Sequence, residues 1–468
     1  MRYDLAVIGG GSAGLSIAAA AAHIGQRVVL FEKGRMGGDC LNCGCVPSKS
    51  LIAIARRADR VLRADSLGLK STLGPVDSES IGSRIQSVIG ALESHDSQER
   101  FEKLGVEVLR HKARFSGPDR IEAGGKQYRA RRYVIATGAR PILPEMPGLA
   151  HTPHLTYETF FEQFALPQHL VIIGAGFVGV EIAQACRRLG SEVSLIDIEA
   201  PLAGEEFEFG ETIRRKLASE GINILAPAKP VSVRCTTSGI AVSLEGIGEV
   251  AGSHLLVAVG RRPQLDDLGL DAAGVKATAQ GISTDRNLRT SNRRIYAIGD
   301  AAGKGQFTHL ASHHAAIVFR HIFFGLSAPA MARVPRVLYT DPELAVAGLA
   351  EDEARSRFGQ SIVVHRRGLG DNDRAIIEGE TEGSIKLVLG RRGRILGVTI
   401  CGHGAGELIQ PWLLAMANRL TIGSMARAVL PYPTVGEIGQ KLAIDHYARF
   451  ASNSWARRII GLIAAFKG

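Results

Sequence analysis

The sequence predicts an α/β fold from a pattern that occurs twice in 468 residues. In each copy a short apolar strand leads into a glycine-rich turn and a helix, and a second apolar strand follows and ends at an acidic residue. This order is typical of βαβ units in a parallel sheet. The expected strands are residues 4–8, 27–31, 170–173 and 192–196, and the expected helices run to about residues 25 and 189.

The turn after each first strand has glycines in the pattern G-x-G-x-x-G, which lets the backbone approach a pyrophosphate at a helix N-terminus. An acidic residue, Glu32 or Asp197, stands 18 residues after the last glycine in each copy. A carboxylate at that place accepts hydrogen bonds from ribose hydroxyls. Two complete copies therefore predict two bound dinucleotides rather than chance glycine-rich turns. The glycines are Gly9, Gly11 and Gly14 in the first copy and Gly174, Gly176 and Gly179 in the second.

A run of three cysteines predicts redox chemistry. Cys40 and Cys45 precede residues 49–65, which favour a helix, and Pro47 suits a first helical position. A thiolate near Cys45 would lie at the positive end of the helix dipole, which lowers its pKa. One alternative is zinc at Cys40 and Cys43, but the sequence has no second pair with ligand spacing. An incidental cysteine cluster is the other alternative.

Composition narrows the class of protein. Six cysteines in a chain of this length do not suggest a secreted protein stabilised by disulfides. The N-terminal sequence lacks the charged, apolar and cleavage regions of a signal peptide. No apolar run is long enough to span a bilayer, so we expect a cytoplasmic location. The net charge is +10, but the basic residues are dispersed, which argues against nucleic acid as a partner. Attraction of anionic cofactors or of a membrane surface explains the charge at least as well.

Two dinucleotides and a cysteine pair together suggest an electron relay. One nucleotide would be a tightly held flavin and the other a nicotinamide that delivers hydride, while a disulfide would receive the electrons. On these motifs the chain resembles the pyridine nucleotide–disulfide oxidoreductases, which include glutathione reductase, dihydrolipoamide dehydrogenase and mercuric reductase. The resemblance covers about residues 3–450. Its signatures are the redox loop from Gly37 to Lys49, Ala-Thr-Gly-Ala-Arg-Pro at 136–141, Val-Gly-Arg-Arg-Pro at 259–263 and Tyr-Ala-Ile-Gly-Asp at 296–300.

The resemblance implies a glutathione reductase-like architecture. Two Rossmann-like domains would bind FAD and NAD(P), and a C-terminal α+β domain would join two chains into a homodimer. The implied boundaries are 1–145 and 266–333 for the two parts of the FAD-binding domain, 146–265 for the NAD(P)-binding domain, 334–450 for the dimerisation domain and 451–468 for a basic amphipathic tail.

The resemblance also implies which residues contact the cofactors. Glu32 would contact the adenosine ribose of FAD, and Asp300 its ribityl chain. Because Asp197 should repel a 2′-phosphate, we expect NADH to be preferred over NADPH. The glycines of the first turn, together with Gly38, Ala113, Thr137, Gly138 and Thr308, would also contact FAD. The glycines of the second turn, together with Gly260, would contact NAD.

The implied catalytic roles centre on the redox loop. Cys45 would be the flavin-facing thiol of a charge-transfer pair, and Cys40 the interchange thiol that meets the substrate. Lys49 would lie near the reactive flavin nitrogen and pair with Glu181, while Phe177 would gate the flavin. Lys49 lies one helical turn after Cys45, so both can face one side of the helix. Without the resemblance, a solvated lysine would be the expected state of Lys49.

The motif at Tyr432 and Glu437 departs from most of the family. In glutathione reductase and dihydrolipoamide dehydrogenase the place of Tyr432 holds a histidine, the acid–base group, held by the matching glutamate and supplied by the partner subunit. Tyrosine, with a reference pKa of about 10, is a poor acid–base group near neutral pH. Mercuric reductase has tyrosine near this place, although residues 464–468 lack that enzyme's cysteine pair.

We therefore expect a mercuric reductase-like enzyme. It would pass electrons from NAD(P)H through FAD to the Cys40–Cys45 disulfide and on to a small-molecule acceptor. A dihydrolipoamide dehydrogenase and a flavin-based redox sensor with little turnover are the alternatives.

Several residues allow two interpretations. Asp39 would either raise the pKa of Cys40 or cap backbone N–H groups. Cys43 would permit disulfide shuffling or soft-metal capture, or would simply fill an apolar site. The histidines at 309, 313 and 314 would bind metal or replace the missing acid–base group, or would pack in a helix. Residues 451–468 would lie on a membrane or dock on the dimer.

Overall fold

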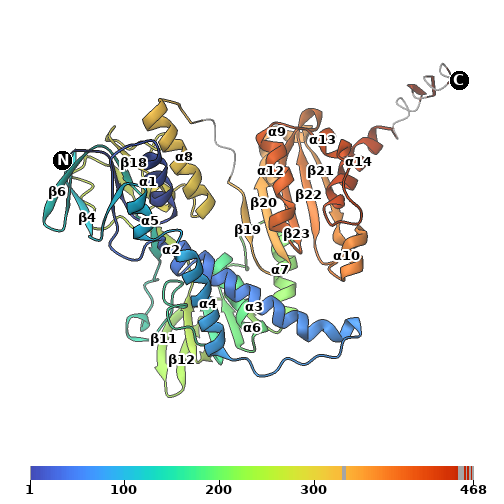
Figure 1. Ribbon diagram of the computed structural model, residues 1–468. Helices are drawn as coiled ribbons and strands as arrows, with labels where there is room; N and C mark the ends of the chain where they lie inside the picture. The colour runs from blue at the N-terminus through green and yellow to red at the C-terminus, as the bar shows by residue number, and fades with distance from the viewer. Residues whose placement is uncertain (1, 329–333, 452–457, 460, 463–464, 466–468) are drawn as a thin grey trace. The chain divides into compact units, whose positions relative to one another are not determined.

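The computed structural model describes the chain except residues 1, 329–333, 452–457, 460, 463–464 and 466–468 (Figure 1). Its contacts divide the chain into two compact units. The first unit is Met1–Leu202 with Leu217–Met331, and the second is Ala203–Lys216 with Ala332–Gly468.

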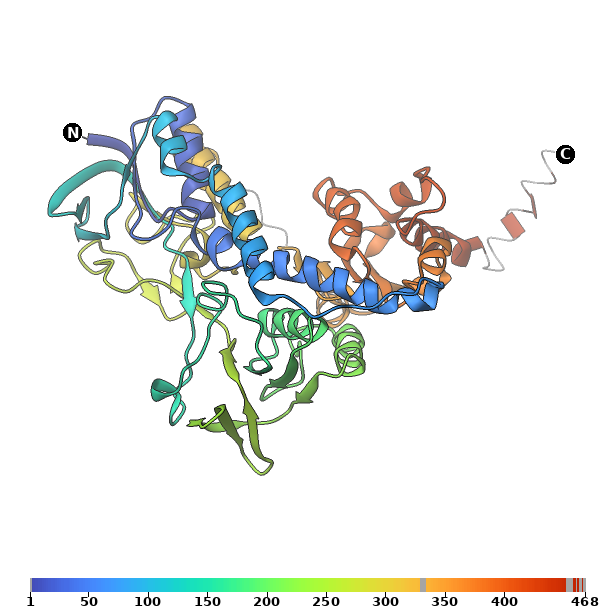
Figure 2. The ribbon, with the colours of Figure 1, turned by 60° about the horizontal axis from the view of Figure 1, so that its bottom comes forward.

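The first βαβ copy lies in a mostly parallel sheet of the first unit. The strands that pair in parallel are ordered β3-β2-β1-β6, with β18 also paired to β6. Strand β2 is buried at every residue, as a strand with both faces covered should be. Helix α1 packs beside α8 (Figure 2). The bounds are β1 Arg2–Ile8, α1 Ser12–His23, β2 Val28–Phe31, β3 Val106–Leu109, β4 Ala113–Gly117, β5 Arg120–Ala123, β6 Lys126–Ile135, β18 Ile295–Ala297 and α8 Thr308–Phe324.

The second βαβ copy forms a parallel sheet in the order β10-β9-β8-β14. A separate antiparallel sheet, β11-β12-β13, lies between β10 and β14 in the chain and is visible at the lower edge of Figure 2. All four predicted strands are present, with ends within two residues of those expected. The bounds are β8 His169–Ile173, α6 Phe177–Arg188, β9 Glu192–Ile196, β10 Asn223–Leu225, β11 Pro230–Thr236, β12 Gly239–Leu244, β13 Gly248–Gly252 and β14 His254–Val257.

The redox loop contains a short helix, α2, followed directly by the long helix α3. Helix α3 begins at Cys45, four residues earlier than expected, so Pro47 is its third residue rather than its first. Proline is tolerated there because N–H groups of the first turn have no intrahelical acceptor. The remaining elements of this unit are α2 Gly38–Asn42, α3 Cys45–Arg63, α4 Ser78–Glu93, α5 Gln98–Lys103, β7 Ala139–Pro141, β15 Arg261–Pro263, β16 Ala277–Thr278 and β17 Gly281–Ile282.

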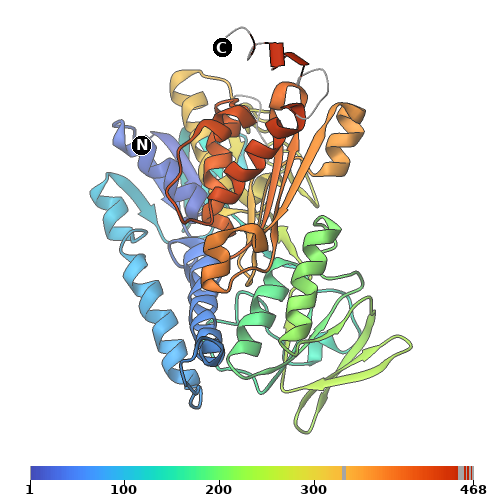
Figure 3. The ribbon, with the colours of Figure 1, turned by 90° about the vertical axis from the view of Figure 1, so that its right-hand side faces the viewer.

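The second unit is an antiparallel sheet in the order β19-β20-β23-β22-β21, with helices packed on it (Figure 3). Its core joins strand residues such as Leu387 to Trp412 of α12 and Leu442 of α14. The bounds are α7 Phe207–Ser219, whose last turn belongs to the first unit, β19 Arg336–Leu338, β20 Glu343–Gly348, α9 Glu351–Phe358, β21 Val363–Gly368, α10 Asp373–Glu378, β22 Ser384–Leu389, β23 Ile395–Gly402, α11 Ala405–Leu408, α12 Gln410–Ala417, α13 Ile422–Arg427 and α14 Glu437–Ala451.

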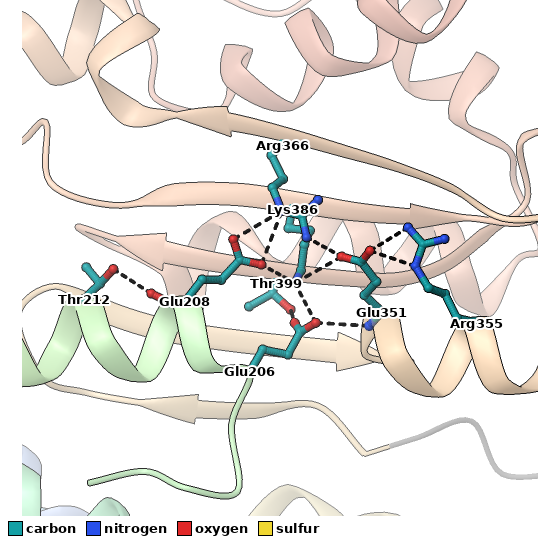
Figure 4. A network of polar contacts seen from close by, with 8 residues as sticks. All are labelled: Glu206, Glu208, Thr212, Glu351, Arg355, Arg366, Lys386 and Thr399. Carbon is teal, nitrogen blue, oxygen red and sulfur yellow. Dashed lines mark hydrogen bonds and ion pairs between the residues drawn. The ribbon is translucent and has the colours of Figure 1, made fainter. Parts of the chain in front are cut away.

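A buried ion network fixes residues 203–216 to this sheet (Figure 4). Lys386 of β22 is 3% exposed, and its Nζ lies 2.6 Å from Glu206 Oε1 and also contacts Glu208. Glu351 lies 3.8 Å from the same ammonium group. Thr399 Oγ1 donates a hydrogen bond of 3.1 Å to Glu206. The network therefore holds the chain segment that follows β9 against the sheet.

These observations confirm the predicted mixed α/β class with two Rossmann-like βαβ units and a C-terminal α+β region. Among the residues that the structure describes, no helix has both the length and the apolar character needed to cross a membrane. Most of the predicted basic tail, 451–468, lies outside the described residues.

Candidate active site

The two glycine turns have the same local geometry. Gly9 and Gly174 have φ angles of +110° and +112°, a region that side chains rarely adopt. A Cβ on Gly14 would lie 1.9 Å from the oxygen of Gly9, and one on Gly179 would lie 1.8 Å from the oxygen of Gly174. Both turns are thus closed in a way that only glycine permits.

The middle glycines are less crowded. A Cβ on Gly176 would meet no atom within 4 Å, and one on Gly11 would meet only Gly38 Cα, at 3.6 Å. Glycine at these two positions is therefore not required by close packing of the protein alone. An open face beside a helix N-terminus is the cradle that a pyrophosphate needs.

The two predicted ribose acids make equivalent contacts. Glu32 Oε2 accepts a hydrogen bond of 2.6 Å from the N–H of Gly10, and Asp197 Oδ2 accepts one of 2.5 Å from Ala175. Each donor is the second residue of its glycine turn. A carboxylate has about four acceptor positions, so both acids keep capacity for ribose hydroxyls.

The redox loop contacts the first glycine turn directly. The N–H of Gly37 donates to Gly10 at 2.9 Å, and a Cβ on Gly38 would lie 2.7 Å from Gly11 Cα. Backbone thus approaches backbone, which explains the glycine at position 38. The contact brings α2 next to the predicted flavin turn.

Other predicted FAD residues lie in the same unit. Thr137 Oγ1 donates to Gln264 at 2.7 Å, which ties the end of β6 to the segment after β15, and Gly138 has a φ of +71°. Burial raises the pKa of Asp300, which is 11% exposed. Thr308 begins α8, and Ala113 is buried at the start of β4.

Several buried polar atoms of this unit have no hydrogen-bond partner among the described residues, and three of them lie in α2, β15 and α8. These three are Asn42 Oδ1, Arg261 Nε and His314 Nε2. Such atoms are costly to bury unless a ligand or water meets them. Together with the glycine cradles and the two acids, they fit the polar groups of FAD and a pyridine dinucleotide.

The redox pair lies where α2 meets α3. Cys40 and Cys45 are both free thiols and are hydrogen-bonded to each other. Cys45 Sγ also lies 3.4 Å from Thr308 Oγ1. The hydrogen bond from Cys40 is the largest influence that lowers the pKa of Cys45. A hydrogen bond from Thr308 and the positive charge of Lys49 lower it further, to about 5 despite burial. The bond to Cys45 and burial raise the pKa of Cys40, so the pair holds one thiolate and one thiol near neutral pH.

The predicted partner of Lys49 is in place. Its Nζ lies 2.8 Å from Glu181 Oε2, and the glutamate side chain is only 5% exposed. The pair joins α3 to α6, the helix of the second glycine turn. Lys49 is therefore not the solvated lysine that the sequence alone favours. Phe177, the predicted gate, is half-buried as the first residue of α6.

The main contacts of Asp39 are neither with Cys40 nor with backbone N–H groups, which were the two alternatives expected from the sequence. Its Oδ2 lies 2.8 Å from Arg261 Nη2 and accepts a bond of 3.3 Å from the Tyr157 hydroxyl. Sequence reasoning missed both partners. Arg261 belongs to the Val-Gly-Arg-Arg-Pro signature, which could have marked it as a functional residue. Tyr157 belongs to no motif. Gly260, just before this arginine, has a φ of +121°.

The histidines after Asp300 support helix packing rather than metal binding. His314 is fully buried and its Nδ1 accepts a bond of 3.2 Å from the N–H of Gly299. Burial lowers the pKa of His314 to about 4, so it is neutral at physiological pH. His309 stacks on Phe307. Within the part of the chain that the structure describes, no group of three or more metal-ligating side chains is positioned to hold a metal ion.

Tyr432 and Glu437 lie in the second unit. The Tyr432 side chain is 70% exposed and its hydroxyl donates to Asp373 Oδ2 at 3.1 Å, a bond that raises the pKa of Tyr432. Glu437 accepts from the backbone N–H of Thr434 at 3.2 Å. The glutamate thus holds the turn that precedes α14, and the Tyr432 phenol keeps its proton near neutral pH.

Comparison with known proteins identifies the family. The sequence matches "Pyridine nucleotide-disulphide oxidoreductase" over residues 3–315 and the dimerisation domain of the same family over 334–443. It is 34% identical over 455 residues to mercuric reductase from Lysinibacillus sphaericus, covering 94% of this chain and 82% of that protein. It is 35% identical over 445 residues to dihydrolipoyl dehydrogenase from Thermus scotoductus, covering 93% and 95%.

A solved structure is also similar. The HOCl-induced flavoprotein disulfide reductase RclA from Escherichia coli, determined as a Cu(II) complex, superposes with a TM-score of 0.85 at 25% identity and covers 94% of this chain and 99% of that one. Matches of this extent show FAD and pyridine nucleotide binding and an NAD(P)H oxidoreductase activity, and the dimerisation domain supports a homodimer. The chain therefore belongs to the class I pyridine nucleotide–disulfide oxidoreductase family, as its motifs predict.

Proposed function

We propose that this enzyme uses NADH to reduce a thiophilic metal ion, with Hg(II) as the first candidate, at the Cys40–Cys45 pair. The observation that carries the proposal is the setting of the cysteine pair where α2 meets α3: Cys45 Sγ lies 3.4 Å from Thr308 Oγ1, and Cys40, Thr308 and Lys49 lower the pKa of Cys45. Mercuric reductases are among the relatives that match over most of this chain.

FAD, when bound, would pass the electrons of the nicotinamide to the disulfide. Two electrons and one proton convert the Cys40–Cys45 disulfide into the Cys45 thiolate and the Cys40 thiol. The ammonium of Lys49 stabilises the thiolate, and Glu181 supplies the anion that a partly buried lysine requires. Returning two electrons to Hg(II) gives Hg(0), re-forms the disulfide and releases one proton, so that NADH and Hg(II) become NAD⁺, Hg(0) and H⁺.

Proton balance favours a metal over a disulfide as the acceptor. Reduction of a disulfide to two thiols consumes two protons, and an acid–base group near the interchange thiol normally supplies one of them. Tyr432 is a poor source because its pKa is raised by the bond to Asp373. Reduction of Hg(II) consumes no proton at the acceptor. Lipoamide nevertheless remains the second candidate, since a dihydrolipoyl dehydrogenase is 35% identical to this chain.

A panel of acceptors tests the proposal. NADH oxidation is followed with Hg(II), lipoamide, glutathione disulfide and a quinone, using the wild type, Cys40→Ser and Cys235→Ser. Cys235 is an exposed cysteine of β11 and serves as the matched control. We expect Hg(II)-dependent turnover that falls at least 100-fold in Cys40→Ser and is unchanged in Cys235→Ser. Faster turnover of lipoamide would overturn the proposal in favour of a dihydrolipoamide dehydrogenase, and turnover with oxygen alone would indicate a redox sensor.

We also infer that NADH is preferred over NADPH. Asp197 directly follows β9 and Glu199 is exposed two residues later, so we expect these carboxylates to repel a 2′-phosphate. We expect kcat/KM to be at least tenfold higher for NADH, and Asp197→Asn to narrow that ratio because it removes one negative charge. Glu192→Gln, at the far end of β9, should leave the ratio unchanged. A higher kcat/KM for NADPH in the wild type would refute the inference.

The finer organisation stays a proposal as well. We infer the domain boundaries given by the family resemblance and a cytoplasmic location. For residues 451–468, peripheral membrane contact and docking on the dimer stay the two alternatives. Co-sedimentation with anionic liposomes, comparing the full chain with one that ends at residue 449, tests the last point. Equal binding of the two proteins would exclude a membrane role for the tail.

A further inference from the structure

The redox loop holds one thiol more than a disulfide needs. Cys43 ends α2 and lies between Cys40 and Cys45 in sequence. A thiolate at any of the three can attack a disulfide formed by the other two, so the loop has three possible isomers. Productive turnover needs only one of them. Some feature of the loop must therefore keep Cys43 out of the exchange.

Asp39, the residue before Cys40, is tied to two other segments. Its Oδ2 contacts Arg261 Nη2 of β15 at 2.8 Å, and the same nitrogen lies 2.9 Å from Asp300 Oδ2. The Tyr157 hydroxyl donates to Asp39 at 3.3 Å, and the guanidinium carbon of Arg261 lies 5.0 Å from the centre of the Tyr157 ring. The first turn of α2 is thus held by one arginine that it shares with Asp300.

These contacts are more than an exposed ion pair. The side chain of Arg261 is 22% exposed and that of Asp39 36% exposed, and Tyr157 is buried beneath them. A guanidinium that binds two carboxylates and stacks on an aromatic ring has few free rotamers. The orientation of α2, and with it that of Cys40, therefore depends on Asp39.

The same carboxylate acts on Cys43 through its charge. Burial, followed by the charges of Asp39 and Glu158, raises the pKa of Cys43 to about 12. Arg261 opposes this rise only in part, whereas at Cys45 the hydrogen bonds from Cys40 and Thr308 and the charge of Lys49 lower the pKa. Because the thiolate is the nucleophile in disulfide exchange, Cys43 is kept inactive while Cys45 is kept active.

We propose that Asp39 is a positioning residue that, through its bonds to Arg261 and Tyr157, selects the Cys40–Cys45 disulfide over the two isomers that contain Cys43. This inference rests on the proposed function of Cys40 and Cys45. It assigns Asp39 a role in choosing the redox pair, distinct from raising the pKa of Cys40 or capping backbone N–H groups.

Disulfide mapping tests the inference without measuring activity. The holoenzyme is reduced, freed of reductant and reoxidised with diamide, which accepts the two electrons and two protons released by each pair of thiols. The remaining free thiol is blocked with N-ethylmaleimide in guanidinium chloride at mildly acidic pH. Trypsin then releases residues 36–49 as one peptide with all three cysteines, and tandem mass spectrometry locates the label. Label on Cys43 means that Cys40 and Cys45 are joined.

In the wild type we expect at least tenfold more label on Cys43 than on the other two cysteines. Asp39→Asn should shift at least a fifth of the label to Cys40 or Cys45, and the milder Tyr157→Phe should shift less in the same direction. Glu249→Gln, which breaks the ion pair between Glu249 of β13 and Arg234 of β11, is the control and should behave as wild type. Tyr157→Phe also provides the test if Asp39→Asn fails to fold.

Two further measurements separate this role from a general structural one. In the reduced native protein, Asp39→Asn should lower the pH at which Cys43 is alkylated, because one nearby negative charge is lost. Acceptor turnover lost in Asp39→Asn should return in Asp39→Asn/Cys43→Ser, which has no third thiol to exchange. An unchanged label pattern in folded Asp39→Asn or Tyr157→Phe would overturn the inference. A wild-type label on Cys40 or Cys45 would instead overturn the proposed redox pair itself.

Discussion

Replacing Lys386 with methionine should destabilise the second unit far more than loss of an ordinary surface lysine. Its ammonium group is 3% exposed and contacts Glu206 at 2.6 Å, with Glu208 and Glu351 beside it (Figure 4). Breaking a buried ion pair from one side costs about 3–5 kcal/mol, because the opposite charge stays buried without a partner. Arg366 still reaches Glu208 and Glu351, so we expect a loss near the lower end, about 3 kcal/mol.

Urea unfolding at a fixed protein concentration measures this loss. The sequence has two tryptophans, and a Trp455→Phe background leaves Trp412, which is buried in the core of the second unit, as a local fluorescent probe. Lys229→Met is the matched control, because the Lys229–Glu245 pair is 63% exposed on both sides and such pairs contribute at most about 1 kcal/mol. The shift in midpoint at an unchanged slope gives the difference in unfolding free energy.

The pH dependence of the loss has a defined sign. Burial acts to raise the pKa of Glu208, but hydrogen bonds from Lys386 and Arg366 outweigh it, so the pKa is lowered from 4.5. A carboxylate with a lowered pKa stabilises the folded state above its unfolded pKa, and that contribution disappears as the pH falls through the folded value. The cost of Lys386→Met should therefore be full at pH 7 and shrink below about pH 4.5. A loss at pH 7 no larger than that of Lys229→Met, or one independent of pH, would refute the reasoning.

Three further results are expected. Gly179→Ala should lower the melting temperature of the apoprotein, since its Cβ would lie 1.8 Å from a backbone oxygen. Gly176→Ala should leave the melting temperature unchanged and should only weaken NADH binding, measured by calorimetry. The rate of iodoacetamide alkylation of Cys45 in the reduced protein should rise with a midpoint near pH 5 and show no such midpoint if the thiolate is not stabilised. Thr308→Ala and Lys49→Met should each move that midpoint upward, because each removes a group that lowers the pKa of Cys45; an unmoved midpoint would show that neither group acts on the thiolate.

The sequence predicted the βαβ units well because the residues that define each unit lie close together in the chain. The glycine turns and their acids lie within one βαβ unit, where strand burial and turn geometry dictate the residue types. The start of α3 was misplaced by four residues because Gly44 precedes it without a side-chain cap, so Cys45 and Val46 gave no sequence signal for a helix start.

Long-range polar contacts were much harder to predict. Lys49 and Glu181 are 132 residues apart, and only the family resemblance joined them. Arg261 and Asp39 are 222 residues apart, and the pairing depends on side-chain geometry at the end of β15. Lys386 lies between apolar residues of β22, and no local sequence pattern predicts its partners Glu206 and Glu208. Such pairs exist only after the sheets have formed, so spacing in the sequence carries no trace of them.

The redox loop shows how far environment separates identical residue types. Cys45 has a pKa lowered to about 5 by a hydrogen bond from Cys40 and by cationic neighbours, whereas burial and a carboxylate raise that of Cys43 to about 12. In sequence the two thiols are two positions apart, and only the expected helix N-terminus and the family resemblance favour Cys45. The structure distinguishes them through their neighbours: the charges of Asp39 and Glu158 add to burial at Cys43, whereas Cys40, Thr308 and Lys49 lower the pKa of Cys45. The sequence thus predicted the lowered pKa of Cys45, whereas the charges that act on Cys43 became visible only in the structure.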